Sequence, residues 1–143
     1  MTTVTKKRRS INILLVEDSP AHAFLTREIL AESEKTSYEI STVKDGVEAL
    51  SYLCSINGYK HAPKPDLIFL DLDLPRMHGF AFLARIKKEA ELKTIPVCIL
   101  TSSDSEADIE KAKTLNADCY LIKPLNLEKF ETTFSGIIAN LLQ

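Results

Sequence analysis

An apolar run that ends in a carboxylate constrains this chain more than any other feature. Residues 67–70 are all apolar, Asp71 follows at once, and Asp73 comes two residues later. A short apolar run between turn residues is typical of a strand buried on both faces of a parallel sheet. Pro75 ends the extended segment because proline has no N–H to donate to a neighbouring strand. Asp71 is therefore expected at the carboxyl end of a central strand, where open α/β sheets place their ligand sites.

The rest of the chain predicts four more strands, and five helices that alternate strictly with the strands. The other strand segments are residues 11–16, 38–43, 95–100 and 119–122. The helices are expected at residues 19–33, 45–56, 79–92, 104–116 and 127–141. Such alternation predicts right-handed crossovers and a parallel sheet with helices on both faces. We therefore expect an α/β, flavodoxin-like, doubly wound sheet of five strands in the order 2-1-3-4-5.

The helices differ in how well their apolar faces are defined. Ser19 and Pro20 are a favourable helix start, as a capping hydroxyl followed by proline at the first helical position. The helix at 104–116 has a thin apolar stripe, so we expect it to be the least firmly held. The last helix has the cleanest helical period in the chain. The residues expected on the buried face of the first helix are Ala21, Phe24, Leu25 and Ile29.

Composition favours one cytoplasmic domain. The chain has 143 residues, 45% hydrophobic and 27% charged, with a formal net charge of −2. This charge balance gives no reason to expect binding to nucleic acid or to a membrane surface. No apolar run approaches the roughly 18 residues that span a bilayer. Residues 1–9 are basic and poor in apolar side chains, so they are expected to form a flexible solvated tail before a domain at 10–143.

The cysteine pattern agrees with a reducing compartment. The three cysteines are odd in number and widely spaced, and they lie in apolar segments. Small buried hydrophobes are therefore a better interpretation than a disulfide framework or a metal site. The cysteines are Cys54, Cys98 and Cys119.

Polar residues that follow four of the strands are expected to meet at one edge of the sheet. Glu17 and Asp18 follow the first strand, Asp71 the third, Thr101 the fourth and Lys123 the fifth. Close carboxylate pairs repel by roughly 1–4 kcal/mol, so this cluster favours a bound cation. Its all-oxygen ligands indicate Mg²⁺, with Mn²⁺ as the alternative, rather than zinc. Metal, ammonium and hydroxyl groups would surround a phosphoryl group on Asp71, which indicates phosphoryl transfer to a carboxylate.

The chain resembles the receiver domains of bacterial two-component response regulators from about residue 11 to residue 142. The resemblance lies in Leu-Leu-Val-Glu-Asp (14–18), Phe-Leu-Asp-Leu-Asp-Leu-Pro-Arg-Met-His-Gly (69–79), Ile-Leu-Thr-Ser (99–102) and Tyr-Leu-Ile-Lys-Pro (120–124). No output domain follows, so the chain is similar to stand-alone regulators such as those of chemotaxis. Three features are similar to regulators that pair with bacterial phytochrome kinases: Ser-Tyr-Leu at 51–53, the loop at 58–65 and the Leu-Asp-Leu-Pro run at 72–75.

The resemblance implies a phosphoacceptor signalling domain and not an enzyme. Asp71 would accept the phosphoryl group from a phosphohistidine of a sensor histidine kinase. Asp18 and Asp71 would bind Mg²⁺ directly, Glu17 would hold it through water, and Asp73 would offer its backbone carbonyl.

The resemblance also implies how the signal leaves the site. Lys123 would neutralise the phosphoryl charge, and its peptide bond to Pro124 would be cis. Thr101 would turn its hydroxyl to the phosphoryl oxygens, and Tyr120 would move inward. The face made by the fourth helix, fifth strand and last helix would then signal to a downstream protein, with the chain as a monomer or a homodimer.

Two positions depart from the pattern of the family. His78 stands where an acidic residue is frequent, and Ser102 stands where alanine or glycine is usual. The larger Ser102 side chain beside the phosphoryl site is expected to slow the approach of hydrolytic water.

Other functions share parts of this pattern. A haloacid-dehalogenase-type phosphatase would use Asp71 and Asp73, with Thr101 and Lys123 in supporting roles. That family needs an acidic metal pair after the lysine, and residues 124–143 supply no such pair. A nucleotide- or flavin-binding module would need a phosphate-binding loop where Glu17 and Asp18 stand, and their charges would repel phosphate. A degenerate receiver that only binds partners would not need the complete set of five residues.

Overall fold

The computed structural model describes residues 10–141 of the chain and contains one five-stranded parallel sheet. The strand order is β2-β1-β3-β4-β5, which confirms the predicted doubly wound topology. The predicted tail at residues 1–9 lies outside the described residues. The strands are β1 (Ser10–Val16), β2 (Ser37–Val43), β3 (Leu67–Leu70), β4 (Val97–Thr101) and β5 (Cys119–Ile122).

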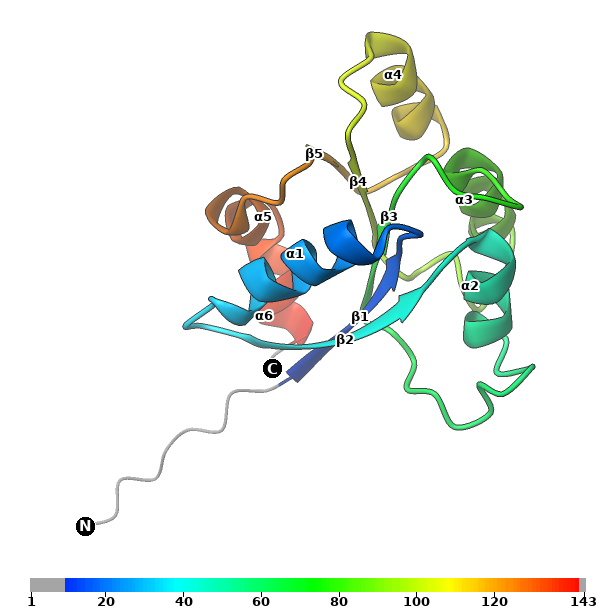
Figure 1. Ribbon diagram of the computed structural model, residues 1–143, viewed down its shortest axis with the longest axis horizontal. Helices are drawn as coiled ribbons and strands as arrows, with labels where there is room; N and C mark the ends of the chain where they lie inside the picture. The colour runs from blue at the N-terminus through cyan, green and yellow to red at the C-terminus, as the bar shows by residue number, and fades with distance from the viewer. Residues whose placement is uncertain (1–9, 142–143) are drawn as a thin grey trace.

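Helices cover both faces of the sheet (Figure 1). The helices α1, α5 and α6 lie on one side of the sheet, and α2 and α3 lie on the other. The helix α4 contributes Ala112 to the core on the side of α2 and α3. The helices are α1 (Pro20–Ala31), α2 (Gly46–Leu53), α3 (Gly79–Lys87), α4 (Glu106–Thr114), α5 (Leu127–Thr133) and α6 (Ser135–Leu141).

The period of two along the strands divides the core into two clusters. Leu14 and Leu70 project toward α2 and α3, while Leu15 and Phe69 project toward α1 and α5. Successive side chains of a strand point to opposite faces, so an unbroken apolar run supplies both clusters. All four residues of β3 are buried, as expected for the strand at the centre of the sheet.

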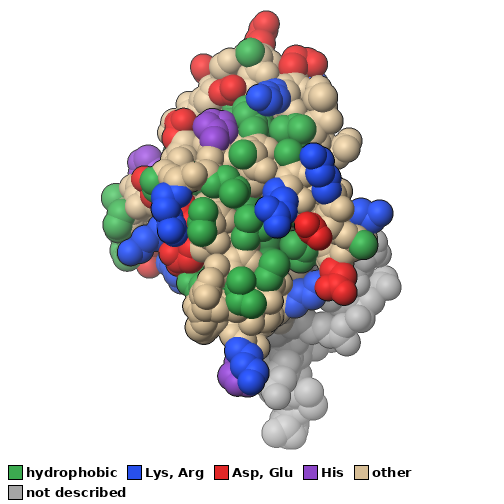
Figure 2. Space-filling model, turned by 90° about the vertical axis from the view of Figure 1, so that its right-hand side faces the viewer, with side chains coloured by type: hydrophobic (Ala, Val, Ile, Leu, Met, Phe, Trp, Pro, Cys, Tyr) green, Lys and Arg blue, Asp and Glu red, His purple; other side chains and the backbone are tan. Residues whose placement is uncertain are grey.

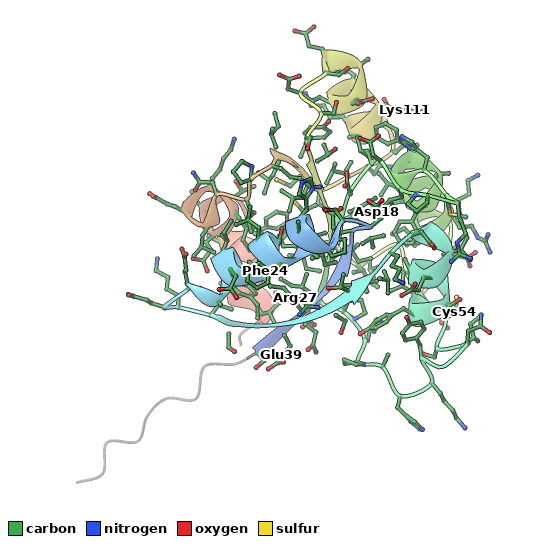
Figure 3. The ribbon with its side chains drawn as sticks, in the orientation of Figure 1. Asp18, Phe24, Arg27, Glu39, Cys54 and Lys111 are labelled. Carbon is green, nitrogen blue, oxygen red and sulfur yellow. The ribbon has the colours of Figure 1, made fainter. Side chains whose placement is uncertain are left out.

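The face of α1 differs from the sequence prediction. Phe24 and Leu25 were expected in the core, but they are 64% and 46% exposed, and Phe24 is labelled in Figure 3. Ala21 is exposed as well, and only Ile29 packs in part against the core. A second stripe of residues also fits the helical period here, and contact with the sheet selects it although it contains the polar Thr26. The residues that α1 buries are Ala23, Thr26 and Leu30.

The second helix and its cysteine also differ from the prediction. The helix α2 ends at Leu53 and not at residue 56, so Ile56 lies in the following turn and is exposed. Cys54 is the residue that caps the end of α2, and it is exposed rather than buried (Figure 3). Of the other two cysteines, Cys98 is buried as predicted and Cys119 is partly buried.

The predicted last helix is divided into α5 and α6. Phe134, at the division, has backbone angles of φ −101° and ψ 13°, which lie outside the helical range. Ser135 and Gly136 follow, and both are weaker helix formers than alanine. The predicted apolar period still holds, because Phe130 and Phe134 are both buried against the sheet.

Hydrophobic side chains on the outer surface are mixed with charged ones. Figure 2 shows this on the face over α2 and α3, where green side chains lie between Lys or Arg and Asp or Glu side chains. Among the described helices, none has the length and apolar character needed to cross a bilayer.

A pair of phenylalanine substitutions tests the orientation of the helices. Phe82 on α3 is fully buried, so Phe82→Ala is expected to lower the free energy of unfolding by about 3–5 kcal/mol. Phe24→Ala removes the same atoms from an exposed site and is expected to stay within about 0.5 kcal/mol of the wild type. Urea unfolding followed by circular dichroism measures both values. Equal losses in the two variants would contradict the observed face of α1.

Candidate functional site

The pairing of β1 with β3 brings the acidic residues together. Val16 and Leu70, the last residues of the two strands, are paired in register. The N–H of Asp71 donates to Val16 O at 3.1 Å, and the N–H of Glu17 donates to Val43 O at 2.9 Å. Both carboxylates therefore stand one residue beyond a paired strand end, at the edge where open parallel sheets place their sites.

Three carboxylates form a compact cluster at this edge. Glu17, Asp18 and Asp71 each offer an oxygen atom, and these three atoms lie within 4.8 Å of one another. Glu17 and Asp71 are only 3% and 6% exposed, while Asp18 is exposed in the loop after β1 (Figure 3). The Asp73 carboxylate is not part of the cluster, but the Asp73 N–H donates to Asp71 Oδ1 at 3.3 Å.

Lys123 extends into the cluster from β5. Its Nζ donates to Asp71 Oδ2 at 2.9 Å and forms an ion pair with Glu17 Oε1. The Lys123 N–H donates to Thr101 O at 2.8 Å, and the Lys123–Pro124 peptide bond is cis, as the resemblance implied. Burial alone would lower the pKa of Lys123, but the hydrogen bonds with Glu17 and Asp71 outweigh it and raise this pKa. Lys123 is therefore held in its charged form.

Burial changes the protonation equilibrium of Glu17. Burial raises its pKa above the ordinary value, and the neighbouring charge of Asp71 acts in the same direction. The hydrogen bond from Lys123 lowers the pKa but does not cancel the rise. A cation in the cluster would favour the ionised form, because an opposite charge stabilises a carboxylate.

His22 belongs to the site, although the sequence did not indicate it. Its Nδ1 lies 3.0 Å from Lys123 Nζ and 3.9 Å from Glu17 Oε1. The His22 N–H donates to Ser19 Oγ, which caps α1 as predicted. A side chain in the first turn of a helix leans back toward the helix start, and this lean is the one sequence signal that could have found His22. His22, Ser102 and Lys123 help line a surface pocket of about 290 Å³.

Thr101 and Tyr120, the predicted switch residues, both interact with Ser103. Thr101 is fully buried at the end of β4, and its Oγ1 accepts from the Ser103 N–H at 3.4 Å. The hydroxyl of Tyr120, on β5, donates to Ser103 O at 2.8 Å. One residue of the β4–α4 loop therefore connects the two side chains to which the resemblance assigns the switch.

The loop between β3 and α3 approaches the backbone at Asp71 closely. A Cβ added to Gly79 would lie 2.5 Å from Asp71 O and 2.8 Å from Leu72 Cα. The Gly79 N–H also donates to Leu72 O at 3.0 Å. Gly79 is thus needed for close packing beside the acidic residue. His78, one of the two positions that depart from the family pattern, caps α3, because its Nδ1 accepts from the Phe80 N–H at 3.1 Å.

An ion pair holds the same loop against α2. Arg76, at a φ of 62°, donates from Nε and Nη2 to the two carboxylate oxygens of Asp45 at 2.8 and 3.0 Å. Asp45 also caps α2 by accepting from the Glu48 N–H. Burial raises the pKa of Asp45, but the hydrogen bonds from Arg76 and Glu48 outweigh it and lower this pKa. Sequence reasoning missed this pair because neither Arg76 nor Asp45 directly follows a strand, so the strand order did not bring them together.

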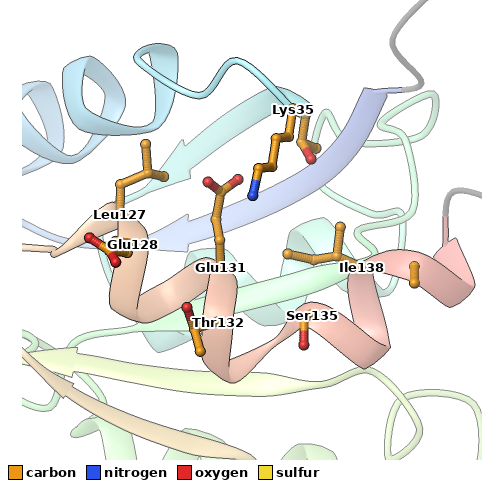
Figure 4. Close-up of a pocket in the computed structure, with 9 residues that line it drawn as sticks. Lys35, Leu127, Glu128, Glu131, Thr132, Ser135 and Ile138 are labelled. Atoms are coloured by element: carbon orange, nitrogen blue, oxygen red, sulfur yellow. The ribbon is translucent and has the colours of Figure 1, made fainter.

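A separate pocket lies away from the acidic cluster. It has a volume of about 560 Å³ and lies between the start of β2 and the helices α5 and α6 (Figure 4). Lys35 and Glu131 extend into it from opposite sides. None of its lining residues carries one of the clustered carboxylates, so the acidic edge remains the candidate site.

Comparison with known proteins places this geometry in a family. A family model described as "Response regulator receiver domain" matches residues 13–135. The chain belongs to this family. Receiver domains are phosphoacceptor signalling domains, so this assignment replaces the alternative of a haloacid-dehalogenase-type phosphatase.

Two similar proteins, Rcp1 and RcpA, illustrate the relationship of this receiver domain. It is 41% identical to the response regulator Rcp1 of Synechocystis sp. over 125 residues, which cover 87% of this chain and 84% of Rcp1. The crystal structure of the phosphorylated cyanobacterial phytochrome response regulator RcpA is 42% identical with a TM-score of 0.75, covering 90% of this chain and 91% of RcpA. The Mn²⁺-bound form of Rcp1 is 39% identical with a TM-score of 0.74, and the match covers 93% of this chain and 95% of the Rcp1 chain.

The affinity of the receiver domain for a divalent cation is expected to depend on pH through Glu17. A protonated carboxyl group cannot hold a cation, so affinity falls as the pH decreases through the raised pKa of Glu17. Removing this partner by Glu17→Gln is expected to weaken Mg²⁺ binding by about 10–100-fold and to flatten its pH dependence. Calorimetric titration with Mg²⁺ over a pH series measures both effects.

The matched control is Glu28→Gln, which removes an exposed carboxylate from α1. This variant is expected to bind Mg²⁺ as the wild type does at every pH. An unchanged pH dependence in Glu17→Gln would show that protonation of Glu17 does not govern the site.

Proposed function

We propose that this receiver domain accepts a phosphoryl group on Asp71 from a histidine kinase and passes the signal to a partner protein. The observation that carries the proposal is the position of the Asp71 carboxylate, which lies within 4.8 Å of the Glu17 and Asp18 carboxylates and accepts from Lys123 Nζ at 2.9 Å. An Asp71 carboxylate oxygen would form a bond to phosphorus while the bond to the phosphohistidine nitrogen breaks. The nitrogen keeps the electron pair of that bond, and the product is an acyl phosphate on Asp71.

Mg²⁺ is the cation that suits the acidic cluster best. Asp18 and Asp71 would hold it directly, Glu17 would hold it through water, and Asp73 would offer its backbone carbonyl. A hard cation with oxygen ligands keeps open positions for a phosphate oxygen, and it would neutralise negative charge on the phosphoryl group. The Mn²⁺-bound form of Rcp1 supports a divalent cation in a related protein, so Mn²⁺ is the alternative occupant.

Lys123 has two roles in this proposal. Without a cation its single positive charge pairs with both Glu17 and Asp71, which are almost fully buried. With a phosphoryl group on Asp71, the same ammonium group would donate to a phosphoryl oxygen. Preorganised charge of this kind stabilises a transition state effectively, because it does not have to be assembled during the reaction.

The proposed output follows from the two side chains that interact with Ser103. Thr101 would turn its hydroxyl toward a phosphoryl oxygen and release the Ser103 N–H. Tyr120 would then exchange its hydrogen bond to Ser103 O for a position closer to Thr101. Movement of the β4–α4 loop would alter the face formed by α4, β5 and α5, which we propose as the surface for the downstream protein.

The partner proposal rests on the relatives. RcpA is described as a cyanobacterial phytochrome response regulator, and a bacteriophytochrome response regulator, RtBRR, is 33% identical with a TM-score of 0.77. We infer that the kinase for this chain is a sensor histidine kinase, of the phytochrome type by this similarity. The receiver domain would extend over residues 10–143, with residues 1–9 as a tail.

The phosphoacceptor role is tested by intact mass after incubation with Mg²⁺ and acetyl phosphate. The wild type is expected to gain one phosphoryl group that is lost in base, and Asp71→Asn is expected to gain none. Asp73→Asn is the matched control, because it changes a neighbouring exposed carboxylate and is expected to keep the adduct. An adduct on Asp71→Asn would refute the assignment, and release of phosphate well beyond one equivalent would indicate a phosphatase.

The switch is tested by nuclear magnetic resonance of the Tyr120 ring. Phosphorylation of the wild type is expected to shift the Tyr120 ring signals, because the hydrogen bond to Ser103 O is lost. Thr101→Ala is expected to accept the phosphoryl group while leaving the ring signals nearly unmoved. Thr101→Ser keeps the hydroxyl and is expected to restore the shift. An equal shift in phosphorylated Thr101→Ala would separate Thr101 from the movement of Tyr120.

A further inference from the structure

Two of the three cysteines lie side by side in the sheet. Cys98 on β4 and Cys119 on β5 are directly paired in the parallel register. Cys98 belongs to the hydrophobic cluster beneath α1 and α5, and Cys119 packs against the same cluster. Both side chains therefore project from the same face of the sheet. The Cys98 thiol donates to Ile99 O at 3.6 Å, and the register places the Cys119 side chain beside it on the next strand.

The distance between the strands suits a covalent bond between these residues. Neighbouring strands lie about 4.8 Å apart, and disulfides join Cα atoms that are roughly 4.4–6.8 Å apart. Both cysteines are free in the structure. Cys98 is fully buried and Cys119 is partly exposed, so a small oxidant in water reaches Cys119 first.

The environment makes Cys119 the more reactive sulfur. The neighbouring Cys98 thiol lowers the pKa of Cys119. The Tyr120 N–H and Lys129 act in the same direction, while burial and Asp118 oppose them. Burial raises the pKa of Cys98 well above its usual range, so Cys98 keeps its proton. A thiolate is the reactive form of cysteine, and Cys119 is the member of the pair that forms one more readily.

We propose that Cys98 and Cys119 form a dithiol modification site that hydrogen peroxide converts into a cross-strand disulfide. The Cys119 thiolate attacks one peroxide oxygen, so that an S–O bond forms, the O–O bond breaks, and hydroxide leaves to take up the thiol proton. The Cys98 sulfur then attacks the Cys119 sulfenic acid; the S–S bond forms, the S–O bond breaks, and hydroxide leaves with the Cys98 proton as water. Two thiols and one peroxide give one disulfide and two waters.

The position of this pair connects oxidation to the two strands that carry the switch residues. Tyr120 follows Cys119 directly, and Thr101 lies three residues after Cys98 on β4. A disulfide would join the backbones of β4 and β5, while Thr101 and Tyr120 project from the opposite face of the same two strands. Intracellular disulfides are more often transient sensors of oxidants than permanent crosslinks. The proposal depends only on the arrangement of the two thiols, and it stands whether or not Asp71 accepts a phosphoryl group.

The test uses the full chain with Cys54→Ser, which removes the exposed thiol and with it any crosslink through that residue. The folded protein is treated with hydrogen peroxide, unfolded, and alkylated with iodoacetamide. The reduced sample is expected to take up two alkyl groups. The oxidised sample is expected to take up none and to yield a linked pair of peptides that contain Cys98 and Cys119. Dithiothreitol is expected to restore both thiols, and peptide mapping separates this change from oxidation of methionine.

Two variants assign the order of the steps. In Cys54→Ser/Cys98→Ala, Cys119 is expected to stop at the sulfenic acid, which dimedone traps. In Cys54→Ser/Cys119→Ala, Cys98 is expected to remain a thiol. If circular dichroism shows that Cys54→Ser/Cys98→Ala does not fold, this second variant alone decides which cysteine is oxidised first. Oxygen addition at Cys119 of the Cys54→Ser protein with no linked peptide would overturn the proposal. Faster oxidation of Cys98 than of Cys119 would overturn the proposed order.

Discussion

The ion pairs of Lys123 with Glu17 and Asp71 are the interaction on which the rest of this site depends. Two carboxylates at the carboxyl ends of β1 and β3 are almost fully buried, and a buried charge is costly unless it is paired. Lys123 supplies the pairing from the far side of the site, at the end of β5. Among the described residues, every buried side-chain nitrogen or oxygen atom has a hydrogen-bond partner. Lys123 therefore compensates part of the negative charge of the acidic cluster.

The strand register of the sheet sets the geometry of this charged site. Each charged group stands just beyond a paired strand end, so the register of the strands sets the distances between them. Behind the acidic edge, Gly79 packs against the Asp71 backbone, and Arg76 holds the β3–α3 loop against the start of α2. On the other side, one residue, Ser103, connects Thr101 with Tyr120. The acceptor side of the site is firmly packed, while the β4–α4 side depends on a few exchangeable hydrogen bonds.

Sequence patterns were sufficient to predict the sheet and the residues at its carboxyl edge, but not the packing of the helices. The strands, their order and the convergence of Glu17, Asp18, Asp71 and Lys123 were all predictable, because parallel strands bring their carboxyl ends to one edge. The buried face of α1 and the ends of α2 and α3 were predicted wrongly, since α3 was expected to reach residue 92 and ends at Lys87. Periodicity defines which residues share a stripe, but it does not say which of two stripes meets the sheet. Phe24 is the clearest case, since its exposure was decided by packing and not by its hydrophobicity.

The sequence by itself determined the chemistry of this protein: four strand ends that carry carboxylate, hydroxyl and ammonium groups in a recognisable order. Only the tertiary structure decided which more distant residues join them. His22 beside Lys123, Arg76 on Asp45, and Cys98 opposite Cys119 all lie on different elements from their partners. Contacts of this kind depend on the register and packing of whole elements. No spacing within a single segment encodes them.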